Sequence, residues 1–291
     1  MALITALPGS EAHAAKLATR LGLPLAPFEL RRFPDGEIYV RMDRIDEHVV
    51  IVGSLYPSPA ERFLELAFVA ATARDLGAKR VGLVAPYLAF MRQDVQFHPG
   101  EGVTSQYFAR MVSATVDWMV TVDPHLHRHT SLDGLYTIPT SIAHAAPAIA
   151  DWVRREVEHP VLVGPDAESV QWVSAVAAGC AAPFVILEKT RRGDRDVSIS
   201  QPSREWNGHT PVLIDDIVST GKTMIEATRQ LRAVGAKAPM CVAIHAVFAD
   251  ALHDELVAAG ASGIITCDTI VHTSNRICVA EPIAEATRAY L

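Results

Sequence analysis

Short apolar runs that alternate with helical stretches constrain the fold of this chain more than any other feature. Residues Val49–Leu55 (VVIVGSL) are few and β-branched, as expected for a buried strand. A helix is expected over residues 59–76, with Ser58 and Glu61 forming a capping box at its start. Arg80–Leu88 then forms the next strand. A strand, a helix and a strand in this order predict a parallel sheet covered by helices.

A second unit of the same design follows further along the chain. It consists of an expected strand, helix and strand at Thr210–Asp216, Met224–Val234 and Met240–Phe248. Leu76–Lys79 (LGAK) and Val234–Lys237 (VGAK) each stand between a helix and an apolar strand. Four residues alone are ordinary helix-exit chemistry, but the shared frame favours duplication of a single α/β domain. A helical stretch from about Ser141 to Glu158 is expected to open the second domain, which predicts domains at residues 1–141 and 142–291.

The charge composition of the chain bears on the class of molecule that it can bind. The 291 residues contain 26 Lys and Arg against 33 Asp and Glu, a net charge of −7. Nucleic-acid-binding domains are usually basic, so this balance argues against a nucleic acid but leaves room for a small anion in a local basic pocket. The 4 cysteines form no CxxC pair and are expected to be free thiols. No apolar run is long enough to span a membrane, and charged residues near Met1 exclude a secretory signal, so a cytoplasmic protein is expected.

The segment Val212–Thr223 (VLIDDIVSTGKT) is the sharpest local signal. An apolar strand ends in two carboxylates, and a Ser/Thr/Gly loop leads into a helix, where backbone N–H groups favour a phosphate. The carboxylates suit sugar hydroxyls or a metal-bound water. Gly221-Lys222-Thr223 does not complete a P-loop, because Asp216 stands where that motif needs Gly. Two Asp that merely cap a turn are the plainer interpretation of the Asp pair alone.

This segment resembles the phosphoribosyl-pyrophosphate loop of type I phosphoribosyltransferases, which ribose-phosphate pyrophosphokinases share. Further segments, in the same order as in that kinase family, resemble its F-S-D-G-E loop, its P-Y, R-Q-D and G-E-P stretch, its V-D-L-H and S-P-D segments and its catalytic-loop K-x-R. They are Phe33–Glu37 (FPDGE), Pro86-Tyr87, Arg92–Asp94 (RQD), Pro99–Glu101 (PGE), Val122–His125 (VDPH), Gly164–Asp166 (GPD) and Glu188–Arg191 (EKTR). The chain is identified as a member of the ribose-phosphate pyrophosphokinase family and is most similar to its short, archaeal-type members.

The resemblance implies two tandem phosphoribosyltransferase-like α/β domains, each a mostly parallel sheet flanked by helices. Residues 1–141 would form the ATP side, and residues 142–291 would carry the ribose 5-phosphate loop. The implied enzyme transfers the β,γ-diphosphoryl group of ATP to the 1-hydroxyl of ribose 5-phosphate, giving 5-phosphoribosyl 1-diphosphate and AMP. Three alternatives stay open: a non-catalytic regulatory homologue of that enzyme, a phosphoribosyltransferase that acts on a base, and a metal-dependent hydrolase built on the His-rich segment at residues 125–129.

The resemblance also implies an ATP site at an interface between identical subunits. Its members are Phe33, Asp35, Gly36, Glu37, Arg92, Gln93 and Asp94. An aromatic ring can stack on adenine, carboxylates can accept hydrogen bonds from its amine, and Arg suits a polyphosphate. Taken alone, Asp35-Gly36 is the tip of a hairpin and Arg92–Asp94 is solvated surface.

Mg²⁺ is the implied cofactor, with His125 and Asp166 as its ligands. Few protein ligands suffice for Mg²⁺, because waters and phosphate oxygens complete its shell. The alternating His125, His127 and His129 could instead form a transition-metal site or a solvated loop.

Two cations, Lys189 and Arg191, are the implied catalytic residues, which would close over the transferring phosphates. Their segment also fits a plain exposed loop. The implied ribose 5-phosphate site comprises Arg191, Asp215, Asp216, Ser219, Thr220, Gly221, Lys222 and Thr223. The chain departs from the family in three places: Ala167-Glu168-Ser169 replaces a Gly-Gly pair after S-P-D, Lys222 replaces a Gly, and Pro124 replaces a Leu beside His125.

Overall fold

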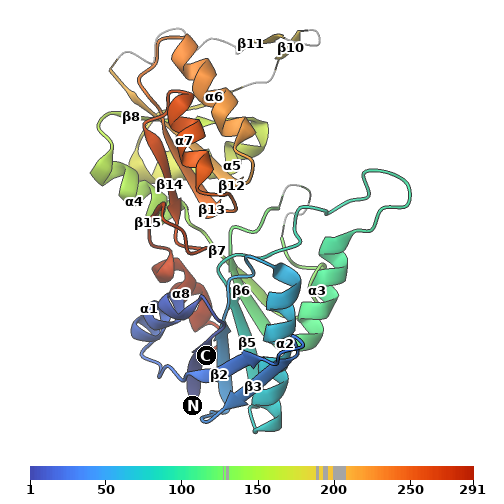
Figure 1. Ribbon diagram of the computed structural model, residues 1–291. Coiled ribbons are helices and arrows are strands. Elements are labelled where there is room, and N and C mark those ends of the chain that lie inside the picture. Colours follow the sequence, from blue (N-terminus) through green and yellow to red (C-terminus); the bar gives the residue numbers. More distant parts are fainter. Residues whose placement is uncertain (127, 129–130, 188–189, 193–195, 199–207) are drawn as a thin grey trace. The chain divides into compact units, whose positions relative to one another are not determined.

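A computed structural model describes residues 1–126, 128, 131–187, 190–192, 196–198 and 208–291 (Figure 1). The side chains of residues 190–192 and 196–198 are not described. Backbone contacts divide the chain into two compact units, Met1–His144 with Ala280–Leu291, and Ala145–Val279. Within the described residues no helix is both long and apolar enough to cross a membrane.

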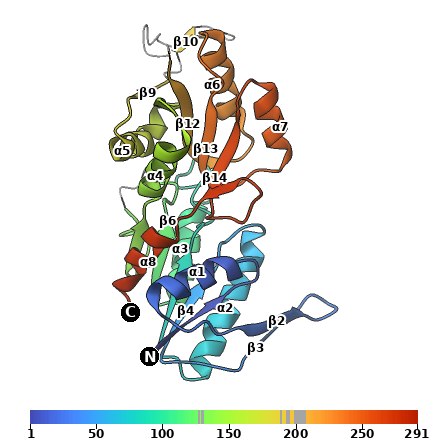
Figure 2. The ribbon, with the colours of Figure 1, turned by 90° about the vertical axis from the view of Figure 1, so that its left-hand side faces the viewer.

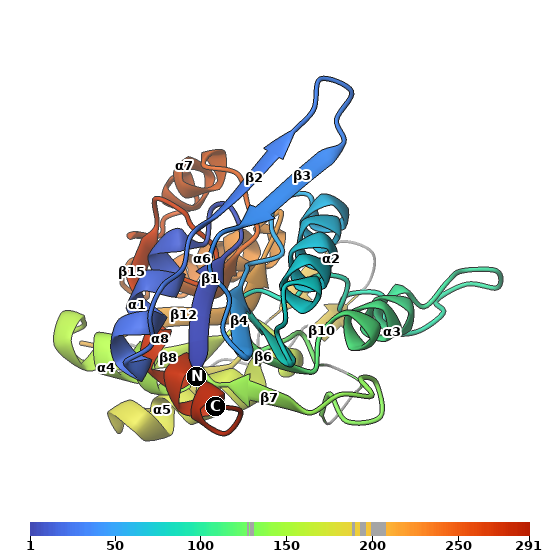
Figure 3. The ribbon, with the colours of Figure 1, turned by 90° about the horizontal axis from the view of Figure 1, so that it is seen from below.

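The first unit is built on a sheet of five parallel strands in the order β1-β4-β5-β6-β7. The strands are β1 (Ala2–Ala6), β4 (His48–Val52), β5 (Arg80–Ala85), β6 (Trp118–Val122) and β7 (Thr140–Ala143). Helices α1 (Glu11–Leu21) and α8 (Ala280–Arg288) pack together on one side, and α2 (Pro59–Asp75) and α3 (Thr104–Thr115) on the other (Figure 3). A separate antiparallel hairpin of β2 (Phe28–Arg32) and β3 (Ile38–Met42) projects from this unit (Figure 3).

The last helix, α8, belongs to the first unit, although its place in the sequence put it in the second expected domain. It packs against α1, β6 and β7. Just beyond it, the Tyr290 ring stacks on the Trp118 ring with centroids 4.7 Å apart, and the Tyr290 carbonyl accepts a hydrogen bond of 2.9 Å from Arg80. These contacts cover an apolar face that α1 alone leaves open.

The second unit contains a sheet of six parallel strands in the order β15-β14-β13-β12-β8-β9. They are β8 (Pro160–Gly164), β9 (Phe184–Ile186), β12 (Thr210–Val218), β13 (Met240–Ala246), β14 (Gly263–Cys267) and β15 (Asn275–Ile277). The pair α4 (Ala146–Glu156) and α5 (Val170–Cys180) and the pair α6 (Lys222–Ala233) and α7 (Ala251–Ala258) lie on opposite sides of this sheet (Figure 2). The short strands β10 (Thr190–Arg192) and β11 (Asp196–Ser198) pair antiparallel, and Ala167–Ser169 form one 3₁₀ turn.

Both units end a helix with the same chemistry. After α2, Gly77 takes a φ of 107° and the Ala78 N–H donates to the Ala73 carbonyl at 2.9 Å. After α6, Gly235 takes a φ of 81° and the Ala236 N–H donates to the Leu231 carbonyl at 3.0 Å. Both are Schellman endings that turn the chain into the next strand. The four-residue echo in the sequence therefore corresponds to a repeated structural joint.

Two local expectations were wrong. Ser58 forms no capping box, because its φ of 58° is left-handed and its side chain makes no capping hydrogen bond; Glu61 instead accepts a hydrogen bond from Arg32. The helix expected from Ser141 begins later: residues 140–143 form β7, which pairs with β6, and α4 begins at Ala146 with a Pro in its first turn.

Candidate active site

The candidate anion loop lies between β12 and α6. β12 lies inside the sheet, between β13 and β8, and Ser219-Thr220-Gly221 joins its end to the first residue of α6, Lys222. The first N–H groups of a helix have no partner within the helix and attract a phosphate. Gly221 has a φ of 69°, and a Cβ there would lie 2.1 Å from Cδ1 of Leu252. Only glycine fits this turn without strain.

Asp215 and Asp216 follow the buried apolar run of β12 that ends at Ile214. The Asp216 N–H donates to the Asp215 carboxylate at 3.0 Å, and the Ile217 N–H donates to the Asp216 carboxylate at 2.6 Å. Asp216 is 2% exposed, and Asp215 is half-buried. Burial, together with the charges of Asp216 and Asp166, raises the pKa of Asp215 to about 8. Three carboxylates in mutual electrostatic range favour a cation or hydroxyl donors.

Asp166 follows β8 and caps the short 3₁₀ turn. Its Oδ1 accepts hydrogen bonds from the N–H groups of Glu168 at 3.0 Å and Ser169 at 3.3 Å. The buried Ser169 hydroxyl donates to the Asp166 carbonyl at 2.6 Å, and a Cβ on Gly164 would lie 2.3 Å from that hydroxyl oxygen. The absence of a side chain at Gly164 therefore makes room for Ser169, so the Ala-Glu-Ser departure from the family is locally well packed.

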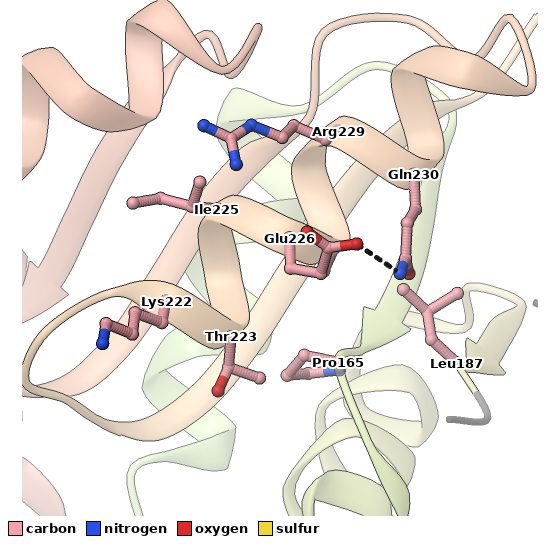
Figure 4. A pocket seen from close by; sticks show the side chains of 9 residues that line it. Pro165, Leu187, Lys222, Thr223, Ile225, Glu226, Arg229 and Gln230 are labelled. Atoms are coloured by element: carbon pink, nitrogen blue, oxygen red, sulfur yellow. Dashed lines mark hydrogen bonds between the residues drawn. The ribbon is translucent and has the colours of Figure 1, made fainter. Parts of the chain in front are cut away.

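A cavity of about 460 Å³ adjoins the anion loop in the second unit (Figure 4). Its walls come from α6, the end of β9 and the residue before Asp166, and they comprise Pro165, Leu187, Lys222, Thr223, Ile225, Glu226, Ala227, Arg229 and Gln230. Glu226 accepts a hydrogen bond of 2.9 Å from Gln230, and Figure 4 shows both side chains turned toward Leu187 and Pro165. Lys222 and Thr223, the first two residues of α6 after the loop, line the cavity, so a ligand on the loop can extend along α6.

In the first unit, residues 33–37 form the tip of the β2–β3 hairpin. The Phe33 N–H donates to the Glu37 carbonyl at 2.8 Å, and the Glu37 N–H donates to the Asp35 carboxylate at 3.1 Å. Gly36 has a φ of 94°. Phe33 is 40% exposed, and Asp35 and Glu37 are exposed. Asp35-Gly36 therefore does form the tip of a hairpin, and this tip presents the aromatic ring and the carboxylates of the expected adenine site to solvent.

The Arg-Gln-Asp segment follows β5, and its three side chains differ in setting. Arg92 is exposed and Gln93 is half-buried, so both are accessible. Asp94 is buried, and its carboxylate accepts a hydrogen bond of 2.8 Å from Arg128. Asp94 thus fixes a second arginine near this loop. Sequence reasoning missed Arg128, whose only signal was its place inside the His-rich segment.

His125 lies half-buried, three residues beyond the end of β6. Two residues before it, the buried Asp123 accepts a hydrogen bond of 2.8 Å from Nδ1 of His144, and this bond raises the pKa of His144. The Asp123–His144 pair has no local signal in the sequence, because the two residues follow different strands. His127 and His129 lie outside the described residues.

The metal ligands expected from the sequence lie in different units, His125 in the first and Asp166 in the second. In the described part of the chain, no three His, Cys, Asp or Glu side chains gather to hold a metal. The carboxylate oxygens of Asp166, Asp215 and Asp216 are nevertheless the donors that Mg²⁺ prefers, and their repulsion, which contributes to the raised pKa of Asp215, is what a cation relieves. The residues present therefore fit Mg²⁺.

The structure describes the side chain of neither expected catalytic cation. Lys189 lies outside the described residues, and Arg191 lies in β10, where the structure describes the backbone alone.

Comparison with protein families assigns both units. Residues 2–115 match the N-terminal domain of ribose phosphate pyrophosphokinase, and residues 131–285 match the phosphoribosyl transferase domain. A ribose-phosphate pyrophosphokinase of Methanopyrus kandleri is 37% identical over 274 residues, which cover 93% of each chain. The chain belongs to the ribose-phosphate pyrophosphokinase family. The family and the enzyme class expected from the sequence are thereby confirmed.

Other members show the same breadth of match. Ribose-phosphate pyrophosphokinases of Methanobrevibacter smithii and Sulfurisphaera tokodaii are 32% and 30% identical, over 96% and 95% of this chain and 97% and 95% of theirs. The crystal structure of phosphoribosylpyrophosphate synthetase from Mycobacterium smegmatis superposes with a TM-score of 0.85 at 24% identity, over 99% of this chain and 98% of that one. This last likeness confirms the expected fold, two α/β units with parallel sheets.

Proposed function

We propose that this chain transfers the β,γ-diphosphoryl group of ATP to the 1-hydroxyl of D-ribose 5-phosphate, producing 5-phosphoribosyl 1-diphosphate and AMP. The observation that best supports this function is the junction of β12 and α6. There two carboxylates, the half-buried Asp215 and the buried Asp216, lie near the end of β12, and a short loop that requires Gly221 leads from the strand to a helix N-terminus. A ligand with several hydroxyls at one end and a phosphate at the other matches this arrangement.

In the second unit, the phosphate of ribose 5-phosphate would bind the loop, and its sugar hydroxyls would bind the carboxylates. Backbone N–H groups and the hydroxyls of Ser219, Thr220 and Thr223 donate to the phosphate, and Lys222 supplies a positive charge. Asp216, buried and fixed by the Ile217 N–H, is the more rigid acceptor for a sugar hydroxyl. Arg191 is proposed to approach the same ligand.

The first unit is proposed to supply the residues that bind ATP. Phe33 stacks on adenine while Asp35, Gly36 and Glu37 contact its edge, and Arg92 and Gln93 bind the phosphates, with Asp94 acting through Arg128. Because the hairpin tip projects into solvent, we propose that it serves the site of a second copy of the chain (Figure 3). The assembly is therefore proposed to be a homo-oligomer.

The chemistry is an in-line displacement. The 1-hydroxyl oxygen of the ribose forms a bond to the β-phosphorus, the bond from that phosphorus to the α,β-bridging oxygen breaks, AMP leaves with that oxygen, and the hydroxyl proton is released to solvent. The protein mainly aligns the reactants and neutralises charge. Lys189 and Arg191 are proposed to stabilise the charge on the transferring group. Mg²⁺, with His125 and Asp166 as proposed protein ligands, would neutralise phosphate oxygens when bound.

A coupled assay for AMP formation from ATP and ribose 5-phosphate tests this function. The matched variants are Asp216→Asn, which alters the buried acceptor, and Asp254→Asn, which alters an exposed carboxylate of α7 in the same unit. We expect AMP from wild type and Asp254→Asn, and a loss of at least tenfold in kcat/KM for Asp216→Asn. Substrate binding without any AMP would instead identify a regulatory homologue, and pyrophosphate release from phosphoribosyl diphosphate and a base would identify a phosphoribosyltransferase.

A further inference from the structure

We infer that Arg32 and Glu65 are positioning residues that determine which way the tip of the β2–β3 hairpin faces, and thereby set the affinity and base selectivity for ATP. This inference rests on the proposed function of residues 33–37. Neither residue belongs to a motif singled out in the sequence. Their role follows from an ion cluster at the point where the hairpin leaves the body of the first unit.

The cluster joins the last residue of β2 to two turns of α2. Nη2 of Arg32 lies 2.9 Å from Oε1 of Glu65 and 3.3 Å from Oε2 of Glu61. The second carboxylate oxygen of Glu65 accepts a hydrogen bond of 3.0 Å from Arg62. The Glu65 side chain is 6% exposed, whereas that of Glu61 is 65% exposed. Glu65 is therefore a buried charge neutralised by two arginines, and removing it leaves both without their shielded partner.

Because side chains alternate along a strand, this contact determines which side chains of β2 point away from α2. Successive side chains of a strand point to opposite sides, so fixing Arg32 against α2 directs Arg31 and Phe33 to the outer face. The outer face is ordered in that sense: the Arg31 guanidinium lies 4.8 Å from the Phe33 ring centroid and 4.1 Å from that of Tyr39, its cross-strand partner. Arg32 also donates to the Gly36 carbonyl at 3.4 Å, within the tip itself.

Apolar burial supplies only part of this constraint, although β3 also packs against α2. On the inner face, Met42 at the base of the hairpin is buried, but Ile38 beside the tip is only half-buried. A two-stranded hairpin is marginal in water without a packed face. Leu30, Val40 and Ile38 are all only half-buried, so above Met42 the ion cluster adds the buried polar contact that we assign to the orientation of the hairpin tip.

Glu65→Gln tests the inference, with Glu61→Gln as the matched control: both remove one negative charge from Arg32, and only Glu65 is buried. We expect Glu65→Gln to raise the KM for ATP about tenfold and to weaken the preference for ATP over GTP, with the KM for ribose 5-phosphate changed less than twofold. Glu61→Gln should change each value less than twofold, since exposed ion pairs contribute little. Arg32→Lys, which keeps the charge but loses the planar fork, should fall between them.

Hydrogen exchange over residues 28–42 provides a readout that does not depend on turnover. The exchange should be faster in Glu65→Gln than in Glu61→Gln or wild type. An unchanged KM for ATP in Glu65→Gln, or an equal rise in the KM of both substrates, would overturn the inference; if Glu65→Gln does not fold, Arg32→Lys decides by the same criteria. Absence of AMP formation by wild type would refute the proposed function instead, and the exchange data would still report on the hairpin.

Discussion

Replacing Gly221 by Ala tests the geometry of the anion loop most directly. At a φ of 69°, an L-residue costs about 1–2 kcal/mol more than glycine. The new methyl would also lie 2.1 Å from Cδ1 of the buried Leu252 side chain, and relieving such overlap costs about 1–3 kcal/mol. We therefore expect Gly221→Ala to destabilise the second unit by about 2–5 kcal/mol.

Gly235→Ala is the matched control. Gly235 lies at the other end of the same helix with a φ of 81°, and nothing lies within 4 Å of a Cβ there. This variant should therefore show the backbone cost alone, about 1–2 kcal/mol. The difference between the two variants measures the overlap with Leu252. The double variant Gly221→Ala/Leu252→Ala should be destabilised by less than the sum of the destabilisations of its two single variants, because the truncated Leu252 side chain leaves room for the new methyl.

Thermal unfolding and steady-state kinetics provide the assay. Gly221→Ala should lower Tm more than Gly235→Ala and raise the KM for ribose 5-phosphate at least tenfold, because the shifted loop no longer directs its N–H groups at the phosphate. Gly235→Ala should leave that KM unchanged. Equal Tm values for the two variants, or an unchanged KM in Gly221→Ala, would refute the reasoning.

Three further changes have defined outcomes. In Mg²⁺-free protein, Asp215→Asn should raise Tm at pH 9 but not at pH 4. The folded-state pKa of Asp215, about 8, exceeds the ordinary 3.8, so the ionised carboxylate costs stability as pH rises through that range. Equal gains in Tm at both pH values would contradict this. Asp166→Ala removes a cap and should cost about 0.5–2 kcal/mol in unfolding experiments, whereas Glu168→Ala, which alters an exposed side chain of the same turn, should cost little. Lys189→Ala should lower kcat about 100-fold while ATP binding measured by calorimetry stays unchanged; normal turnover would remove Lys189 from the mechanism.

The parts of the fold that could be predicted from the sequence are those in which local chemistry and tertiary structure agree. The segment from Thr210 to Thr223 was predicted as a strand, a loop and a helix because an apolar β-branched run meets hydroxyl and glycine residues there. The helix ends at Gly77 and Gly235 were anticipated for the same reason, and the structure shows both to be Schellman endings. Each signal lies within a few residues and needs no knowledge of distant contacts.

What could not be predicted depends on partners far away in the chain. The amphipathic sequence of α8 specifies a helix with an apolar face but not which sheet receives it, and the stacking of Tyr290 on Trp118 decides that. Asp94 looked like a ligand-binding carboxylate, yet Arg128, 34 residues away, pairs with it. Ser58 had the right neighbours for a capping box, but its left-handed backbone prevents it. The Arg32–Glu65 pair, 33 residues apart, had no local signal.

The assignment of α8 to the first unit has a consequence for how the protein is made. Residues Ala145–Val279 form one uninterrupted stretch of chain, whereas the first unit needs both Met1–His144 and Ala280–Leu291. During synthesis from the N-terminus, the ribosome completes the second unit before α8 emerges. Until α8 emerges, part of one apolar face of the first sheet stays uncovered, whereas all residues of the second unit are already available to fold.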